Sequence, residues 1–427
     1  MNANPSLSSR IGRLLDVFST LRYRNMRLFW SGLLAQVAGQ QMMTVTIGWL
    51  AFELTESPLA LGIINLLLAA PRIVLNLVGG ALADRWDQRT LIVIGQSLAM
   101  VVLLALATLT LTGNVEVWHL GAGALLIGFF HALEEPSRAS LFPHLLPRRD
   151  LLPTAVPLIS MAWQLSRLTA PAIAGFVIHA AGAGTSFFIS AAGGALMITM
   201  IRLLQVGRIP RDQRGSILQS ISEGMKYAWG YDVFRIVIGM AFFNSLLAMG
   251  YILMLPVFAA DVFQVDSRGL GLLYSFGGVG GIVALLTVSK MVRRLGPGKV
   301  ILGGIIVLNS ALIAFALSPS FELALAFMTL VGFAGHVYLT GGEVLLQMLV
   351  PDELRGRVMG LYQSLWSIMP LGAALLNSIA EFAGAPLALA GGSATVLLFA
   401  LVIGLPNKAL RSSSVETPAE PERAGQA

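Results

Sequence analysis

The chain has 427 residues, of which 56% are hydrophobic and 12% are charged, with a net charge of +6 and no cysteine. Because an average soluble domain is about 25% charged, this composition excludes a large soluble catalytic domain. The lack of cysteine excludes disulfide scaffolds, thiolate metal sites and cysteine nucleophiles, and we expect a polytopic, all-α membrane protein.

Twelve apolar stretches long enough to cross a bilayer follow one another along the chain. They cover residues 28–52, 59–83, 90–112, 118–146, 152–180, 185–205, 233–259, 268–290, 299–318, 322–350, 356–381 and 386–406. Charged residues and Pro136 interrupt the fourth stretch, which we nevertheless expect to continue to residue 146. The longest connection, 206–232, contains either an interfacial helix or a plain soluble loop helix at 215–230.

The basic residues predict the topology. Of the 28 bases, 25 lie in the termini and in the loops on one side, whereas the opposite loops carry one, Arg268. The positive-inside rule therefore places both termini in the cytoplasm, and no nucleic-acid binding is expected. The predicted parts are a cytoplasmic arm (1–27), a six-helix half (28–205), a cytoplasmic linker (206–232), a second six-helix half (233–406) and a disordered cytoplasmic tail (407–427).

An internal repeat supports two related halves. At offsets of 209 and 204 residues, glycine, arginine and proline positions of the first half recur in the second. The pairs are Gly62 with Gly271, Arg85 with Arg294, Gly95 with Gly304, and Pro147 with Pro351. Two parallel halves of six helices are typical of the major facilitator class.

The segment GGALADRWDQRTLIV at 79–93 resembles the signature between helices 2 and 3 of major facilitator transporters. Its matching positions are Gly80, Asp84, Arg85 and Arg89, and Asp87 replaces the usual glycine. With the repeat, the resemblance extends over about residues 20–406. It implies a major facilitator fold, with twelve membrane helices in two pseudo-symmetric six-helix halves around a central cavity.

A second segment, 132–175, is similar to the enterobactin-exporter-like subfamily, which includes siderophore and macrolide exporters. Its matching positions are Pro136, Arg138, Pro143, Pro147, Leu151, Arg167, Pro171 and Gly175. The resemblance implies alternating-access export of a small amphipathic, siderophore- or antibiotic-like compound, by a monomer in the bacterial cytoplasmic membrane. An importer of the same fold and a non-transporting membrane sensor or scaffold are the alternatives. An enzyme is not expected.

The signature suggests a cytoplasmic gate. By resemblance, Asp84 pairs with Arg138 across the cytoplasmic ends of helices 2 and 4, beside Arg85 and Arg89. A purely structural role is the alternative, because an aspartate at a helix start accepts hydrogen bonds from free backbone N–H groups.

Arg72 and Arg167 are the only bases at bilayer depth. A charge there costs at least about 2.5–3.5 kcal/mol unless it faces water or a partner. The two arginines therefore either bridge packed helices or bind an anionic or polar substrate. Gln36, Gln40 and Tyr338 are further candidates for substrate binding.

Proton coupling needs a carboxylate in a partly dry site, where desolvation favours the neutral form and lets it exchange a proton near neutral pH. Glu134 and Glu135 are the main candidates, with His131 as a relay member and Glu343 as a further acid. The alternative is that both glutamates simply pair with Arg138 and Arg148. Since no nucleotide or zinc motif is present in the sequence, we expect the proton gradient to supply the energy without a cofactor.

Overall fold

A computed structural model describes residues 18–78, 87–205 and 232–412, and every regular element within these ranges is helical. The predicted all-α class is confirmed. The chain forms two compact units. The first comprises the described residues of Met1–Arg214 together with Leu255–Ser275, and the second comprises those of Gly215–Met254 and Phe276–Ala427.

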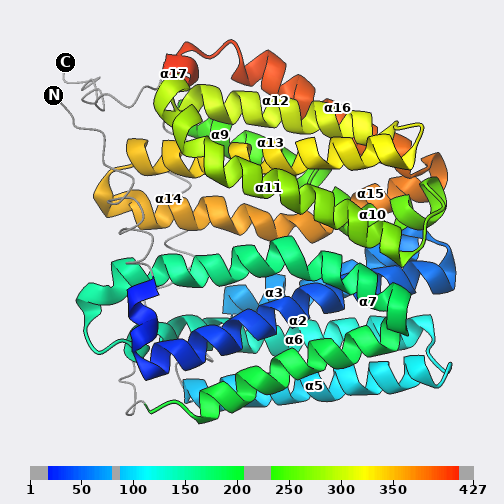
Figure 1. The fold of residues 1–427 in the computed structure, drawn as a ribbon. Coiled ribbons are helices and arrows are strands. Elements are labelled where there is room, and N and C mark those ends of the chain that lie inside the picture. Colours follow the sequence, from blue (N-terminus) through cyan, green and yellow to red (C-terminus); the bar gives the residue numbers. More distant parts are fainter. Residues whose placement is uncertain (1–17, 79–86, 206–231, 413–427) are drawn as a thin grey trace. The chain divides into compact units, whose positions relative to one another are not determined.

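The first unit is built on five long helices (Figure 1). Its elements are η1 (Ser19–Arg22), α2 (Arg24–Thr55), α3 (Pro58–Val78), α5 (Gln88–Leu111), α6 (Val117–Leu141), η2 (Phe142–Leu145), η3 (Arg149–Leu151) and α7 (Leu152–Arg202). Helix α2 packs against α7, α5 packs against both α6 and α7, and α3 packs against α6. This arrangement brings polar side chains of α2, α3, α5 and α6 together.

Helix α7 covers two of the predicted membrane stretches. Its 51 residues contain one non-helical position, Gly182, with φ 81° and ψ 162°. Side-chain-bearing residues rarely adopt positive φ, whereas glycine does so readily. The break lies between the predicted stretches 152–180 and 185–205. The fourth predicted stretch is also continuous, since α6 passes through Pro136 and η2 extends the span to Leu145.

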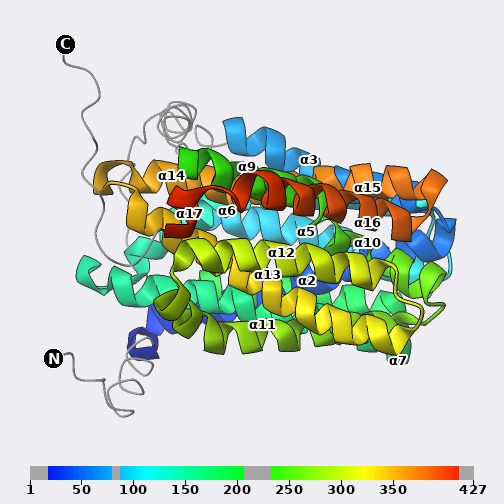
Figure 2. The same cartoon turned by 90° about the horizontal axis from the view of Figure 1, so that it is seen from above.

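The second unit contains the remaining helices. They are α9 (Asp232–Leu247), α10 (Tyr251–Val257), α11 (Ser267–Leu295), α12 (Pro297–Ala316), α13 (Phe321–Leu349), α14 (Asp352–Ser364), η5 (Leu365–Ile368), α15 (Met369–Ala383), α16 (Ala385–Phe399), η6 (Ala400–Gly404) and α17 (Lys408–Ser412). The segment η4 (Phe258–Val262) and the adjoining ends of α10 and α11 belong to the first unit. Helix α12 packs between α13 and α16 (Figure 2).

Local sequence signals set several helix starts. The Asp87 side chain accepts a hydrogen bond of 3.0 Å from the Thr90 backbone N–H and caps α5. Ser320 caps α13 in the same way at the Leu323 N–H. Such caps satisfy backbone donors that have no partner inside the helix.

Within residues 18–78, 87–205 and 232–412, nine helices are long and apolar enough to cross a bilayer. Helices α2 and α3, which are not among the nine, cover the first predicted stretch and the described part of the second. The number of twelve crossings stays a prediction. The helix expected at 215–230 lies outside the described residues.

Apolar side chains occupy both the interior and the outer surface of each unit. In the first unit Phe29, Leu33 and Met197 belong to one buried cluster. In the second unit Leu286 is 73% exposed and Phe382 is 89% exposed. An exposed apolar surface of this extent is unusual for a soluble protein and is expected where helices face lipid.

Candidate functional site

A buried ionic cluster lies in the first unit, and we call it the Glu134 cluster. Arg138 donates to Glu134 one helical turn earlier on α6, with Nη1 2.9 Å from Oε1. Gln36 of α2 donates to the same carboxylate oxygen at 2.5 Å, and its own amide oxygen accepts from Arg138 at 3.0 Å. Gln96 of α5 donates to Oε2 of Glu134. Three helices thus converge on one carboxylate.

The Glu134 cluster is enclosed by protein. The side chain of Glu134 is 1% exposed and that of Arg138 is 10% exposed. Removing two charges from water is costly, and their attraction offsets the cost only when the remaining hydrogen-bonding groups are satisfied. The amides of Gln36 and Gln96 satisfy both carboxylate oxygens. The negative charge of the ionised Glu134 and the positive charge of Arg138 cancel, so the cluster as a whole is neutral.

A second group, the Arg72 cluster, adjoins the first along α2 and α6. Arg72 of α3 lies with Nη2 2.8 Å from Nδ1 of His131. The amide oxygen of Gln40, when turned toward the guanidinium, accepts from Arg72 at 2.6 and 3.2 Å. A guanidinium only donates, so Nδ1 of His131 is the acceptor and the imidazole is neutral in this contact.

Close helix packing brings the Arg72 cluster together. A side chain at Gly128 of α6 would collide with the backbone carbonyl oxygen of Leu68 on α3. Glycine at this position therefore lets α3 and α6 approach, and Arg72 and His131 lie one turn further along their helices. Gln36 and Gln40 are also one turn apart, so the two clusters form a continuous polar strip.

A cavity of about 300 Å³ lies beside the Glu134 cluster, between α2, α6, η2 and α7. Arg138 and Glu135 line it, and Phe29, Phe142 and Trp163 contribute aromatic walls. The Arg138 guanidinium carbon lies 5.6 Å from the centre of the Trp163 ring, a cation–π distance. The cavity therefore combines aromatic surface with charged groups of both signs, as an amphipathic ligand would need.

Other candidates lie elsewhere. Arg167 is exposed on α7, one turn beyond Trp163. Arg89 donates to the Leu204 carbonyl at 3.3 Å. In the second unit, Glu343 accepts from Gln363 at 3.1 Å, whereas Tyr338 is 1% exposed within α13.

The gate predicted for Asp84 and Arg85 lies outside the described residues. Of the two gate residues that the structure describes, Arg89 makes the contact with Leu204 given above, and Arg138 donates hydrogen bonds to Glu134 and Gln36. Arg148 forms an exposed ion pair with Asp150, with Nη2 2.7 Å from Oδ2. The alternative in which Glu134 and Glu135 pair with Arg138 and Arg148 therefore fails for Arg148.

Sequence reasoning missed Gln96, which donates the hydrogen bond to the second carboxylate oxygen of Glu134. Its signal was available, because Gln96 is the only amide or charged side chain in the apolar stretch 90–112. A polar amide inside such a stretch must find a hydrogen-bonding partner at a helix interface.

Comparison with known proteins gives a family and several relatives. A family model described as transmembrane secretion effector matches residues 16–421. The multidrug efflux pump Tap of Mycolicibacterium fortuitum is 25% identical over 358 residues, which cover 81% of this chain and 87% of that protein. The staphyloferrin A transporter of Staphylococcus aureus is 25% identical over 370 residues, covering 84% and 90%. The enterobactin exporter EntS of Escherichia coli O1:K1 is 25% identical over 311 residues, covering 71% and 72%.

Solved structures share the fold. The crystal structure of the nucleoside transporter NupG matches with a TM-score of 0.69 at 13% identity, covering 90% of this chain and 100% of that one. At this identity the likeness shows the fold alone.

Proposed function

The chain belongs to the transmembrane secretion effector family of major facilitator transporters, and from that premise we propose that it exports a small amphipathic compound in exchange for protons. The transporter works by alternating access as a monomer in the bacterial cytoplasmic membrane, with both termini in the cytoplasm. The proton gradient supplies the energy, and no cofactor takes part.

The observation that carries this proposal is the Glu134 cluster. A carboxylate and a guanidinium buried inside a membrane helix bundle are expensive to maintain, and intramembrane charges of this kind mark ion or substrate pathways. Glu134 is the group that takes up and releases the proton. When Glu134 is protonated, Arg138 loses its counter-ion, and the loss of this attraction favours rearrangement of α2, α5 and α6 around it.

The exported compound is of the siderophore or antibiotic type. The names of the relatives support this class, since they include a multidrug efflux pump and an enterobactin exporter. The cavity beside Arg138 and Trp163 supports it as well, because its aromatic and charged lining suits an amphipathic molecule. Asp84 pairs with Arg138 in the cytoplasm-closed state and serves as the gate.

The proposal is tested in a deletion strain complemented with wild type or with Glu134→Gln. Secreted siderophore under iron limitation and macrolide tolerance are measured side by side. We expect the deletion to lose one of the two and Glu134→Gln to restore less than a tenth of it at equal membrane abundance. If neither phenotype changes on deletion, export of this class of compound is refuted.

Direction and coupling are tested with purified protein in liposomes that contain a pH-sensitive dye. An outward substrate gradient should drive protons in the opposite direction in wild type, and Glu134→Gln should abolish this flux. Asp150→Asn, which neutralises an exposed carboxylate outside the Glu134 cluster and the cavity, is the control. Proton movement in the same direction as the substrate would exclude exchange and favour the importer.

A further inference from the structure

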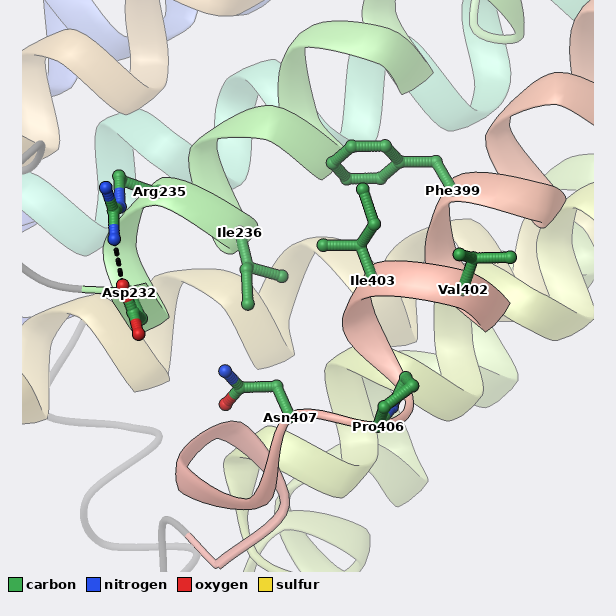
Figure 3. A pocket seen from close by; sticks show the side chains of 8 residues that line it. All are labelled: Asp232, Arg235, Ile236, Phe399, Val402, Ile403, Pro406 and Asn407. Carbon is green, nitrogen blue, oxygen red and sulfur yellow. Dashed lines mark hydrogen bonds and ion pairs between the residues drawn. The ribbon is translucent and has the colours of Figure 1, made fainter.

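The second unit contains a cavity of about 610 Å³ where the start of α9 meets the end of η6 (Figure 3). Asp232 and Arg235 lie at one end of it, and Phe399 and Val402 line the other. The cavity takes no part in the proposed export mechanism, whose residues lie in the first unit.

The cavity lies at the end of two candidate membrane spans. One span begins at Asp232 and the other ends at Gly404. Basic residues cluster at this end, with Arg235 on α9 and with Lys408 and Arg411 on α17. Such residues are typical of the cytoplasmic membrane surface. The polar end of the cavity therefore lies at the level of lipid head groups.

The polar end offers one acceptor and two donors. Asp232 and Arg235 form a direct ion pair (Figure 3), and their side chains are 65% and 49% exposed. The amide oxygen of Asn407 accepts from the Leu410 N–H at 2.8 Å, which leaves the Asn407 NH₂ group to donate toward the cavity. Asp232 and Arg235 are the charged residues that line the cavity, and as a pair they carry no net charge.

The apolar end is shaped for a hydrocarbon chain. Phe399 packs on Phe243 with ring centres 4.9 Å apart, and Gly239 lies opposite the ring. A Cβ atom at Gly239 would lie 3.1 Å from Cζ of Phe399. The π-helix η6 follows Phe399 directly, and π-helical turns often occur at functional sites. Val402 on η6 is 61% exposed and extends the apolar wall outward.

We propose that this cavity binds a phosphatidylethanolamine-type phospholipid of the cytoplasmic leaflet. Its phosphate accepts hydrogen bonds from Arg235 and Asn407, its ammonium group donates to Asp232, and an acyl chain lies along Phe399 and Val402. A neutral Asp–Arg pair complements a zwitterionic head group rather than an anionic one. A choline head group has no N–H and cannot donate to Asp232.

The test uses the full-length protein, delipidated in detergent and titrated with dioctanoyl-phosphatidylethanolamine or dioctanoyl-phosphatidylcholine, with binding followed by native mass spectrometry. We expect wild type to bind the ethanolamine lipid about fivefold more tightly, which corresponds to about 1 kcal/mol and is the upper range for a solvent-exposed charge pair. Asp232→Asn should remove most of this preference, and Arg235→Gln should weaken the binding of both lipids.

The control is Arg148→Gln, which breaks another exposed ion pair, in the first unit, and should leave both affinities unchanged. Glycerophosphoethanolamine, the head group without chains, should bind at least about tenfold more weakly, because it lacks the apolar contact. Equal affinity of wild type for the two lipids overturns the proposal. So does an unchanged preference in Asp232→Asn, or binding of the chain-free head group as tight as that of the lipid. Wild-type-like melting of each variant in detergent excludes misfolding as the cause.

Discussion

Replacing Glu134 with alanine should strongly destabilise the protein, because it leaves Arg138 charged and nearly enclosed. The side chains of Glu134 and Arg138 are 1% and 10% exposed, so water does not readily replace the lost carboxylate. Removing one member of a buried ion pair typically costs about 3–5 kcal/mol. Gln36 and Gln96 also lose their acceptor, which favours the upper half of that range.

The ionic origin of this effect is tested by a double-mutant cycle with Arg138→Met. When both charges are removed, no uncompensated charge remains, so the double variant should be more stable than the sum of the single losses predicts by at least about 2 kcal/mol. Unfolding of the detergent-solubilised protein in denaturant, followed by tryptophan fluorescence, gives each value. Arg148→Gln is the control, since its exposed pair with Asp150 is worth at most about 1 kcal/mol. Additive losses, or single variants within about 1 kcal/mol of wild type, would refute the reasoning.

Three further substitutions probe the same unit. Gln96→Leu removes a donor to Glu134 and should lower the unfolding free energy by about 1–3 kcal/mol; unchanged denaturant midpoints would show that the hydrogen bond is dispensable. Gly128→Val forces α3 and α6 apart at Leu68 and should cost about 1–3 kcal/mol by overpacking. The melting temperature of the variant measures this cost. A wild-type melting temperature would mean that α3 and α6 do not approach each other as closely as in the structure. Trp163→Leu removes the ring over Arg138 and should weaken substrate binding about fivefold, at the lower end of aromatic contributions, in an equilibrium binding assay; equal affinities would place the substrate elsewhere.

Features that can be recognised within a single helix could be predicted from the sequence. The internal repeat predicted the continuation of α6 beyond Pro136, and hydropathy predicted the all-helical class; the structure confirms both. It also drew attention to Glu134, Arg138, Arg72 and His131, because charged or titratable groups in apolar stretches are conspicuous.

Which of these residues meet could not be predicted, because contacts between helices depend on rotation, depth and spacing. Arg72 and His131 were expected to serve different purposes, yet they share a hydrogen bond. The role of Gln96 was not predicted, because its hydrogen-bond acceptor, Glu134, lies on a different helix. The structural alternative for the glutamates was half right: Glu134 pairs with Arg138, whereas Arg148 pairs with Asp150.

The two clusters lead to a last prediction, on the charge of the exported compound. In the described part of the chain, the hydrogen bonds of Arg72 go to neutral groups, Gln40 and His131, whereas Arg138 is neutralised by Glu134. Protonation of Glu134 leaves Arg138 without a counter-ion as well. An anionic compound should therefore bind more tightly as pH falls, and a cationic compound less tightly.

Thermodynamic linkage between protonation and substrate binding limits how strongly substrate affinity can change with pH, and it relates the direction of that change to the mode of transport. One proton can change affinity by at most about tenfold per pH unit, and exchange requires that proton and substrate disfavour each other. Proton exchange thus favours a cationic compound, while an anionic siderophore would load together with the proton. Measuring the affinities of a siderophore and a macrolide between pH 5.5 and 8.5, in wild type and Glu134→Gln, separates the two. If Glu134→Gln retains the pH dependence of wild type, then Glu134 does not couple proton to substrate, whatever the sign of the substrate's charge.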